Sequence, residues 1–239
     1  MDNSIIVALL ILFLPLVAFL YQLFFGKNLG ARTHLVSLGI IGVMFGLSVS
    51  FFFQLFDHSS TGPILDVSGL WFSTGAFSLE LGIYIDKVTV IMLMVVSLIS
   101  FLVHLYSTSY MEGDPRYSRY FAFLGLFTFS MNGIVLSDSL VMMYLFWELV
   151  GLSSYLLIGF WFEKESAANA SKKAFLTNRV GDIGMFIGML LIFFTVGTFN
   201  INGITEAVSA GAFDGKMELL SIAGILVFMG AVGKSAQFP

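Results

Sequence analysis

The chain has 239 residues and a formal charge of −4, and 58% of its residues are hydrophobic while only 11% are charged. Together with a mean hydropathy of +0.95, this composition indicates a polytopic membrane protein and excludes a soluble globular domain. The acidic balance gives no reason to expect nucleic acid as a partner. Absence of cysteine excludes disulfides and cysteine-bound iron–sulfur clusters, and the few histidines are scattered along the chain, so we expect no metal or haem site.

Three apolar runs in the first half of the chain are long enough to cross a bilayer, which takes about 20 residues. They cover residues 5–25, 34–56 and 87–106. No basic residue precedes the first run, so we interpret it as a retained helix, bent at Pro15, and not as a cleaved signal peptide. Gly42 and Gly46 in the second run have the spacing that lets helices approach closely. His104 in the third is compatible with a satisfied structural histidine and with a proton relay.

Between the second and third runs, residues 57–86 have turn and strand character. Leu and Ile alternate with small or polar residues from Ser78 to Ile85, which is the period of a β-strand. Turn-forming residues 73–75 stand just before this stretch. The sequence predicts a small β-hairpin outside the membrane, in which residues 77–85 pair as strands.

The second half of the chain predicts four further spans, at residues 120–136, 140–162 and 172–197 and from about residue 218 onward. Their connections are predicted as a tight turn with Asp138 as helix N-cap, a charged loop at residues 163–173 and a soluble loop at residues 199–217. Gly184 and Gly188 are expected to allow close helix packing. The fold class predicted is therefore an all-α polytopic membrane protein with about seven transmembrane helices and a small extracytoplasmic β-hairpin.

Glu148 is a carboxylate well inside the fifth span, where an acidic residue costs about 2.5–3.5 kcal/mol near the helix centre. A chain tolerates that cost where the charge has a partner or a path to water. Tyr144, Gly151 and Tyr155 share its helical face, which therefore suits a protein interior better than lipid. Glu148 is the strongest candidate functional residue in the sequence.

Three further ionisable residues stand inside the sixth and seventh spans. Arg179 and Asp182 are three residues apart on one helix face, where they either neutralise each other or belong to a polar path. Lys234 lies deep in an apolar helix, follows a glycine and precedes Pro239, so we expect the helix to break near it, as in the discontinuous helices of transporters. We predict Glu148 and Lys234 as a working pair, because a nearby carboxylate favours a charged lysine and apolar surroundings favour a neutral one.

The loops differ in charge between the two sides of the membrane. Seven basic residues fall on the side reached after the first, third and fifth spans, and two on the other: Lys27, Arg32, Arg116, Arg119, Lys164, Lys172 and Lys173 against Lys87 and Lys216. Because cytoplasmic loops carry the excess of Lys and Arg, the N-terminus is predicted to be extracytoplasmic.

Four stretches of the chain resemble the antiporter-like membrane subunits of proton-pumping NADH:quinone oxidoreductase (respiratory complex I), and most closely the L-type subunit, chain 5. They are residues 102–107, 146–161, 172–182 and 233–239. The resemblance implies that Glu148 is the fifth-helix glutamate and Lys234 the seventh-helix lysine of a proton channel, with Asp182 near that lysine. Together with Arg179 and His104 these are the candidate proton-pathway residues.

The resemblance also implies an organisation and a set of partners. Residues 1–116 would hold the first three helices with the external hairpin at 57–86, and residues 117–239 would begin the first antiporter-like half-channel. FMN, iron–sulfur clusters and quinone are expected in partner subunits, M- and N-type antiporter-like subunits as neighbours, and the cell inner membrane or an equivalent energy-transducing membrane as the location. Family members continue beyond the position of Pro239 and complete an inverted repeat, so we expect this chain to be part of a longer protein.

Three functions compete at this point. The first is a non-redox proton-translocating subunit of complex I, which the motif at residues 177–182 favours. The second is the large subunit of a multisubunit sodium/proton antiporter, whose channel residues would look alike. The third, a structural module without transport, gives little reason for buried ionisable residues.

The charge difference between the loops predicts orientation. A reporter fused after Lys164 should be cytoplasmic, and one fused near Gly75 should be extracytoplasmic, because the seven basic residues are retained inside. Protease or alkylation access to the two fusions measures this, and the reverse pattern would overturn the predicted direction of every helix.

Overall fold

The computed structural model describes residues 3–57, 62–74 and 77–237, and the chain forms two compact units. The first unit contains residues 1–67 and 83–136, and the second contains residues 68–82 and 137–239. In the described part of the chain, seven helices of 19 to 32 residues are long and apolar enough to cross a membrane. The predicted number of spans is confirmed.

The first unit is built on four long helices: α1 (Asn3–Leu29), α2 (Thr33–Asp57), α3 (Lys87–Tyr110) and α4 (Tyr117–Leu136). Helix α1 continues through Pro15 and packs against α2 and α4, while α3 packs against α2 and α4. A Cβ atom on Gly125 would lie 3.1 Å from the Pro15 carbonyl oxygen, so this glycine lets α4 approach the α1 backbone. The predicted close approach at Gly46 is wrong within this chain, because a Cβ atom there would meet no described atom within 4 Å.

Polar side chains fasten three of these helices at one end. The Gln22 side-chain amide donates to the Thr33 carbonyl and to the Ser37 hydroxyl, both at 2.7 Å. Ser118 at the start of α4 donates to the Gln22 carbonyl at 2.8 Å. Gln22 is buried, and these bonds join α1, α2 and α4 at this end.

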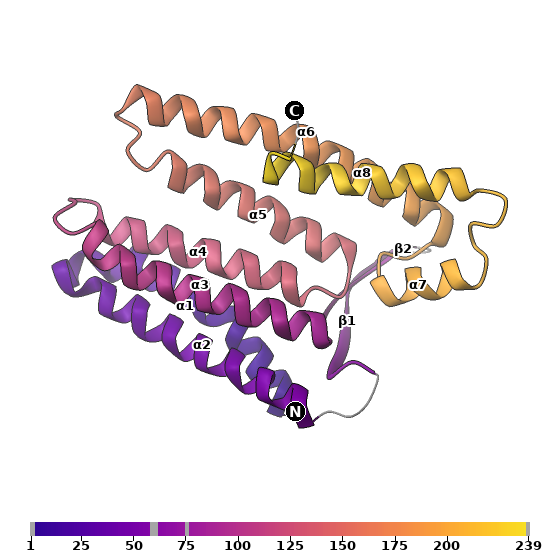
Figure 1. The fold of residues 1–239 in the computed structure, drawn as a ribbon, viewed down its shortest axis with the longest axis horizontal. Helices are drawn as coiled ribbons and strands as arrows, with labels where there is room; N and C mark the ends of the chain where they lie inside the picture. Colours follow the sequence, from indigo (N-terminus) through magenta and orange to yellow (C-terminus); the bar gives the residue numbers. More distant parts are fainter. Residues whose placement is uncertain (1–2, 58–61, 75–76, 238–239) are drawn as a thin grey trace. The chain divides into compact units, whose positions relative to one another are not determined.

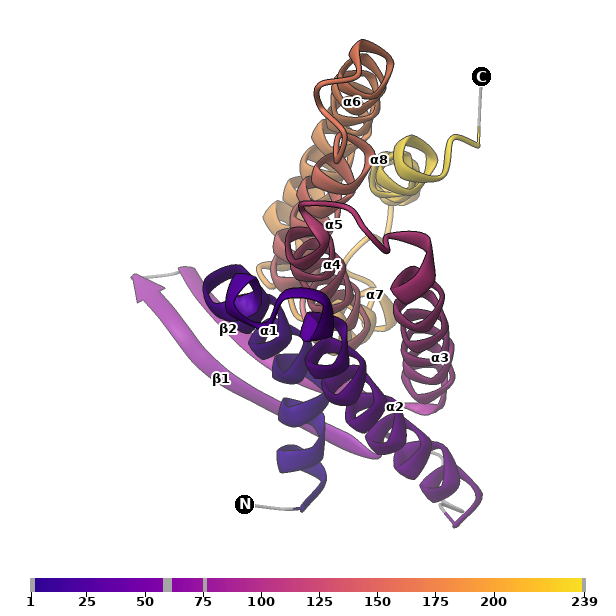
Figure 2. The same cartoon turned by 90° about the vertical axis from the view of Figure 1, so that its left-hand side faces the viewer.

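The predicted hairpin is confirmed. Strand β1 (Leu65–Thr74) pairs with β2 (Phe77–Ile85) in a two-stranded sheet, drawn side by side in Figure 2. The predicted turn residues Ser73 and Thr74 belong to β1, and residue 75 lies outside the described residues. After β2, Asp86 caps α3 by accepting from the Thr89 amide at 2.7 Å.

The second unit contains helices α5 (Leu140–Ile158), α6 (Glu165–Val196), α7 (Ile201–Ser209) and α8 (Met217–Ser235). The predicted charged loop at residues 163–173 is wrong over most of its length, since α6 begins at Glu165 and carries both Lys172 and Lys173. The stretch is rich in alanine, which favours a helix without any apolar run, and Glu165 suits the positive N-terminal end.

Two further expectations about loops are corrected. The predicted soluble loop at residues 199–217 contains α7, which Asn200 caps by accepting from the Gly203 amide at 3.0 Å. Asp138 is not the N-cap of α5; that role belongs to Ser139, which accepts from the Met142 amide at 3.4 Å.

Asp138 instead joins three segments of the second unit. Its carboxylate accepts from the Gly82 amide of β2 at 2.9 Å and from the Asn200 side chain at 3.4 Å. The start of α5, the hairpin strand and the start of α7 are therefore connected by one buried acid, 2% exposed.

Helices α6 and α8 lie side by side with their backbones in close contact (Figure 1). A Cβ atom on Gly181 would lie 2.7 Å from the Met229 carbonyl oxygen, and one on Gly188 would lie 2.7 Å from the Ala223 carbonyl oxygen. The predicted close packing at Gly184 is also confirmed, since its Cβ would lie 3.0 Å from Met229.

We predict that Gly188→Ala destabilises the second unit by about 1–3 kcal/mol, because the new methyl group meets backbone that cannot rotate away. Gly224→Ala on α8 is the matched control, since its Cβ would meet nothing within 4 Å. The thermal midpoint of the purified complex measures the difference. Equal shifts for both variants would contradict the role of Gly188 in helix contact.

Candidate functional site

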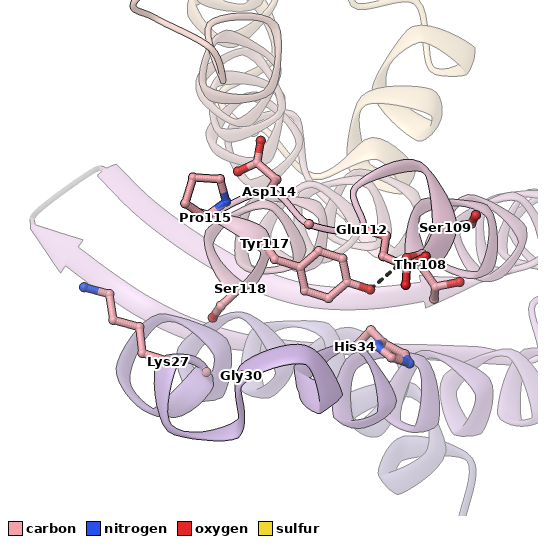
Figure 3. Close-up of a pocket in the computed structure, with 12 residues that line it drawn as sticks. Lys27, Gly30, His34, Thr108, Ser109, Glu112, Asp114, Pro115, Tyr117 and Ser118 are labelled. Atoms are coloured by element: carbon pink, nitrogen blue, oxygen red, sulfur yellow. Dashed lines mark hydrogen bonds between the residues drawn. The ribbon is translucent and has the colours of Figure 1, made fainter.

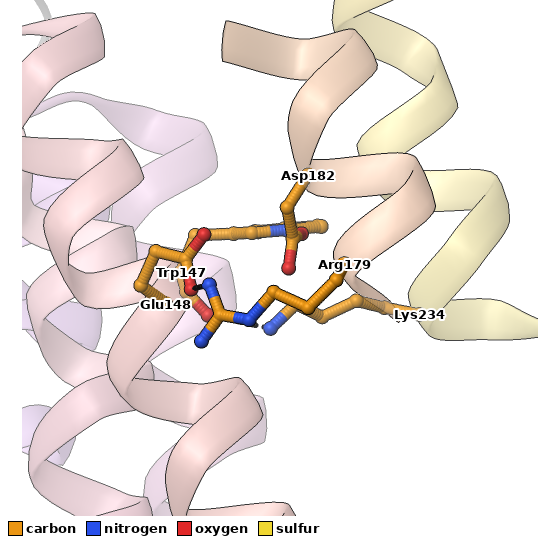
Figure 4. A network of polar contacts seen from close by, with 5 residues as sticks. All are labelled: Trp147, Glu148, Arg179, Asp182 and Lys234. Atoms are coloured by element: carbon orange, nitrogen blue, oxygen red, sulfur yellow. Dashed lines mark hydrogen bonds and ion pairs between the residues drawn. The ribbon is translucent and has the colours of Figure 1, made fainter. Parts of the chain in front are cut away.

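Three helices of the second unit bring five side chains together (Figure 4). Helix α5 supplies Trp147 and Glu148, α6 supplies Arg179 and Asp182, and α8 supplies Lys234. Four of the five are residues that the sequence singled out. Trp147 is the one that sequence reasoning missed.

Glu148 forms an ion pair with Arg179 across the interface of α5 and α6. Of the two alternatives left open for Arg179 and Asp182, mutual neutralisation does not describe Arg179, whose guanidinium extends to the neighbouring helix. It also lies 4.6 Å from the centre of the Phe175 ring, one turn earlier on its own helix. The other carboxylate oxygen of Glu148, Oε1, is buried without a hydrogen-bond partner in the described structure.

Trp147 contacts both remaining charged residues. Its indole N–H donates to the Asp182 carboxylate at 2.9 Å, and Asp182 is only 2% exposed. The Lys234 ammonium donates to the Trp147 carbonyl oxygen at 2.5 Å and lies 5.3 Å from the centre of the indole ring. A tryptophan in an apolar segment needs a partner for its N–H group, and that requirement was the signal available in the sequence.

Gly151 makes room for the lysine one turn after Trp147. A Cβ atom on Gly151 would lie 2.8 Å from the Lys234 Nζ atom, so any larger residue would displace the ammonium from the carbonyl. Lys234 stands at the end of α8, because Ser235 is the last helical residue and Ala236 adopts the left-handed conformation with φ 47°.

The predicted polar face of α5 is confirmed by its neighbours. The Tyr144 ring lies 5.6 Å from that of Phe186, and the Tyr155 ring lies 5.5 Å from that of Phe175, both on α6. With Glu148 and Gly151 between them, the whole face packs against protein.

The predicted working pair has no direct contact. No hydrogen bond or ion pair joins Glu148 to Lys234 among the described residues, because Arg179 occupies Glu148 and the Trp147 carbonyl occupies Lys234. The site therefore consists of two neighbouring polar groups: Glu148 with Arg179, and Trp147 with Asp182 and Lys234.

His104 belongs to the first unit, so it is not one of the residues that the second unit gathers. Its ring is fully buried on α3, and Nδ1 donates to the Ser100 carbonyl at 2.8 Å. Its Nε2 is buried without a partner in the described structure. One nitrogen of the ring is thus satisfied structurally.

Metal ligands do not gather in the described ranges, where no three His, Asp or Glu side chains are close enough to hold an ion. A carboxylate and an ammonium can exchange a proton, and in this site a guanidinium and an indole N–H lie beside them.

Two family profiles match the chain. Residues 137–239 match the family described as NADH:quinone oxidoreductase/Mrp antiporter transmembrane region, and residues 71–121 match the N-terminus of chain 5 of NADH-ubiquinone oxidoreductase (complex I). The first match contains all five residues of the site.

Curated relatives are similar over most of the chain. NAD(P)H-quinone oxidoreductase subunit 5 of the chloroplast of Chlorokybus atmophyticus is 45% identical over 86% of the chain. NAD(P)H-quinone oxidoreductase chain 5 of Synechocystis sp. is 45% identical over 78% of it. The chain spans 32% of the first relative and 27% of the second.

Two solved structures share the fold at lower identity. A chain of the Mrp complex from Dietzia sp. has a TM-score of 0.81 and 21% identity over 97% of this chain and 24% of its own length. A chain of the archaeal membrane-bound sulfane sulfur reductase has a TM-score of 0.79 and 19% identity over 95% of this chain and 44% of its own.

The ion pair on α5 and α6 can be tested by a double-mutant cycle. We predict that Glu148→Gln with Arg179→Gln is less destabilising than the sum of the single changes, because each single change leaves one charge without its partner. A coupling energy of about 0.5–1 kcal/mol is expected, near the lower end for contacting residues because the Arg179 side chain is 38% exposed.

The thermal midpoint of the purified complex is the measurement for all variants of the cycle. Arg179→Gln with Asp182→Asn is the matched control, and it should show the smaller coupling. Stronger coupling in the control would show that Arg179 pairs with Asp182 on its own helix and not with Glu148.

Proposed function

Because the chain belongs to the antiporter-like membrane subunits that include chain 5 of NAD(P)H-quinone oxidoreductase, we propose that it forms part of a non-redox, proton-translocating subunit of that enzyme. The observation that carries the proposal is the cluster of Glu148, Arg179, Asp182 and Lys234 around Trp147, inside helices that can span a membrane. Buried ionisable groups are costly in a bilayer and are retained where they serve transport.

Lys234 is the proton carrier in this proposal, and Glu148 is the group that exchanges protons with it. When Arg179 moves away from Glu148, the carboxylate can accept the proton that Lys234 releases: an N–H bond breaks, an O–H bond forms, and an ammonium and a carboxylate become an amine and a carboxylic acid. A guanidinium at about 7 Å from a charged group interacts with it by about 2.4 kcal/mol at an effective dielectric near 20. Movement of the guanidinium alone can therefore bias the transfer.

Trp147 is the positioning residue of this site. It holds the Asp182 carboxylate through its indole N–H and the Lys234 ammonium through its backbone carbonyl. Release of either contact would let Asp182 and Lys234 approach each other, which stabilises the charged lysine and opposes release of its proton. The two contacts of Trp147 therefore keep Lys234 apart from Asp182, so that its proton can be released to Glu148.

The remaining assignments are also part of the proposal. We place residues 117–239 at the start of an antiporter-like half-channel, next to M- and N-type antiporter-like subunits, with flavin, iron–sulfur clusters and quinone bound elsewhere in the complex. The chain is a multi-pass protein of an energy-transducing membrane, and its N-terminus is proposed to face away from the cytoplasm.

A second candidate is the large subunit of a multisubunit sodium/proton antiporter. It is favoured by the description of the family matched at residues 137–239, which also names Mrp antiporters. Purification of the tagged full-length protein separates the two: flavin and iron–sulfur absorbance in the purified complex supports the oxidoreductase, and a complex without them supports the antiporter.

We predict that Glu148→Gln and Lys234→Ala each abolish most proton pumping and slow the coupled quinone reduction, because each removes one partner of the transfer. Glu148→Asp should keep part of both activities, since it retains the carboxylate at a changed distance. Pumping by the purified complex in proteoliposomes, with NADH oxidation measured in parallel, provides the readout.

Two further variants separate transport from structure. Trp147→Phe keeps a ring beneath Lys234 and removes the donor to Asp182, so it should reduce pumping with normal assembly. Gly224→Ala, which meets no neighbouring atom, should leave pumping unchanged. Full pumping by an assembled Lys234→Ala complex would reduce the lysine to a static contact between helices.

A further inference from the structure

A cavity of about 400 Å³ lies at one end of the first unit, between the end of α1 and the start of α4. Three of its lining residues are basic: Lys27, Arg116 and Arg119. These three are among only 11 Lys and Arg residues in the chain. Ser118, in the first turn of α4, adds the positive end of a helix.

The same cavity has an apolar wall one helical turn deeper. Leu23 precedes Lys27 by four residues on α1, and Phe123 follows Arg119 by four residues on α4. Each apolar side chain therefore lies about 6 Å further along its helix, away from the helix end. The Arg119 guanidinium lies 5.4 Å from the centre of the Phe123 ring.

An adjoining cavity of about 600 Å³ has the opposite charge character (Figure 3). It shares Lys27, Pro115 and Ser118 with the first cavity, and it is lined by the carboxylates Glu112 and Asp114. Asp114 also accepts from the backbone amide of Arg116 at 2.7 Å, so a negatively charged group is best placed against Lys27 and Arg119.

Hydrogen bonds and close packing fix α1 against α4 beside the two cavities. Ser118 bonds to Gln22, and Gln22 in turn bonds to α2, as described above. Gly26 has no side chain, and a Cβ atom there would collide with the Ser118 hydroxyl. Together these contacts hold the basic residues on helix ends whose packing is set.

We propose that this cavity binds the phosphate group of an anionic membrane phospholipid, with an acyl chain along Leu23 and Phe123. Basic groups at the surface end and apolar groups deeper along the same two helices match the order of a headgroup and its acyl chain. Basic pockets between transmembrane helices on the cytoplasmic side are suited to anionic headgroups, and Lys27, Arg116 and Arg119 lie on the side predicted to be cytoplasmic. The proposal is independent of the proton-transfer site.

The experiment uses the complete purified complex, delipidated and returned to nanodiscs with phosphatidylglycerol or phosphatidylcholine. We expect the native protein to retain phosphatidylglycerol in native mass spectrometry and to gain thermal stability from it. Lys27→Gln with Arg119→Gln should weaken this binding about 25-fold, at roughly fivefold for each basic residue near the surface. The charge-retaining Lys27→Arg with Arg119→Lys should fold and keep the binding.

Lys172→Gln with Lys173→Gln is the matched control, because it removes the same charge from exposed positions on the same predicted side. It should leave the binding unchanged. An equal loss in this control, or no loss in the Lys27 and Arg119 variant, would overturn the proposal. Glycerol 3-phosphate in solution is the second arm: binding as tight as that of the lipid would make the ligand a soluble phosphate ester and overturn the membrane source.

Discussion

The backbones of α6 and α8 touch at two glycines, each of which directly precedes a charged residue of the site. A Cβ atom on Gly181 would lie 3.2 Å from the Gly233 Cα atom, and Asp182 and Lys234 are the next residues on the two helices. Close packing of glycines is how membrane helices associate when lipid supplies no hydrophobic driving force. Here the same contact sets where a carboxylate and an ammonium emerge, so helix packing and site geometry depend on one constraint.

Trp147 supplies hydrogen-bond partners to the two charged residues, Asp182 and Lys234, that the glycine contact brings close together. Two charged groups that leave adjacent backbones in an apolar environment need hydrogen-bond partners, because an unsatisfied charge is expensive there. The indole N–H and the backbone carbonyl of one residue supply both partners, and Gly151 supplies the space. Arg179 and Glu148 satisfy each other beside it. The Oε1 atom of Glu148 remains without a hydrogen-bond partner in the described structure.

Asp138 plays a different role at the end of the second unit. It connects the hairpin strand β2, the turn before α5 and the cap of α7 through Gly82 and Asn200. Helix positions at that end are therefore coupled by hydrogen bonds and not by apolar contact alone. In a unit whose helices meet through glycines, such a connection limits sliding along the helix axes.

Much of the fold could be read from the sequence, because the controlling physics is local. Hydrocarbon thickness acts on each apolar run separately, and the period of two acts within residues 77–85, so the seven spans and the hairpin followed directly. The start of α6 at Glu165 and the short helix α7 were missed, because alanine content and an asparagine cap shape helices that no apolar run marks.

The candidate site was also predictable only in part from the sequence. Glu148, Asp182 and Lys234 were identifiable from sequence, since a charge in an apolar helix is costly whatever its partner. Their partners were not: Arg179 pairs with Glu148 on another helix instead of Asp182 on its own, and Trp147 serves both other charges. Those choices depend on how α5, α6 and α8 approach one another across glycines far apart in sequence. Only the tertiary structure decides that approach, because no periodicity within one helix encodes the distance to the next.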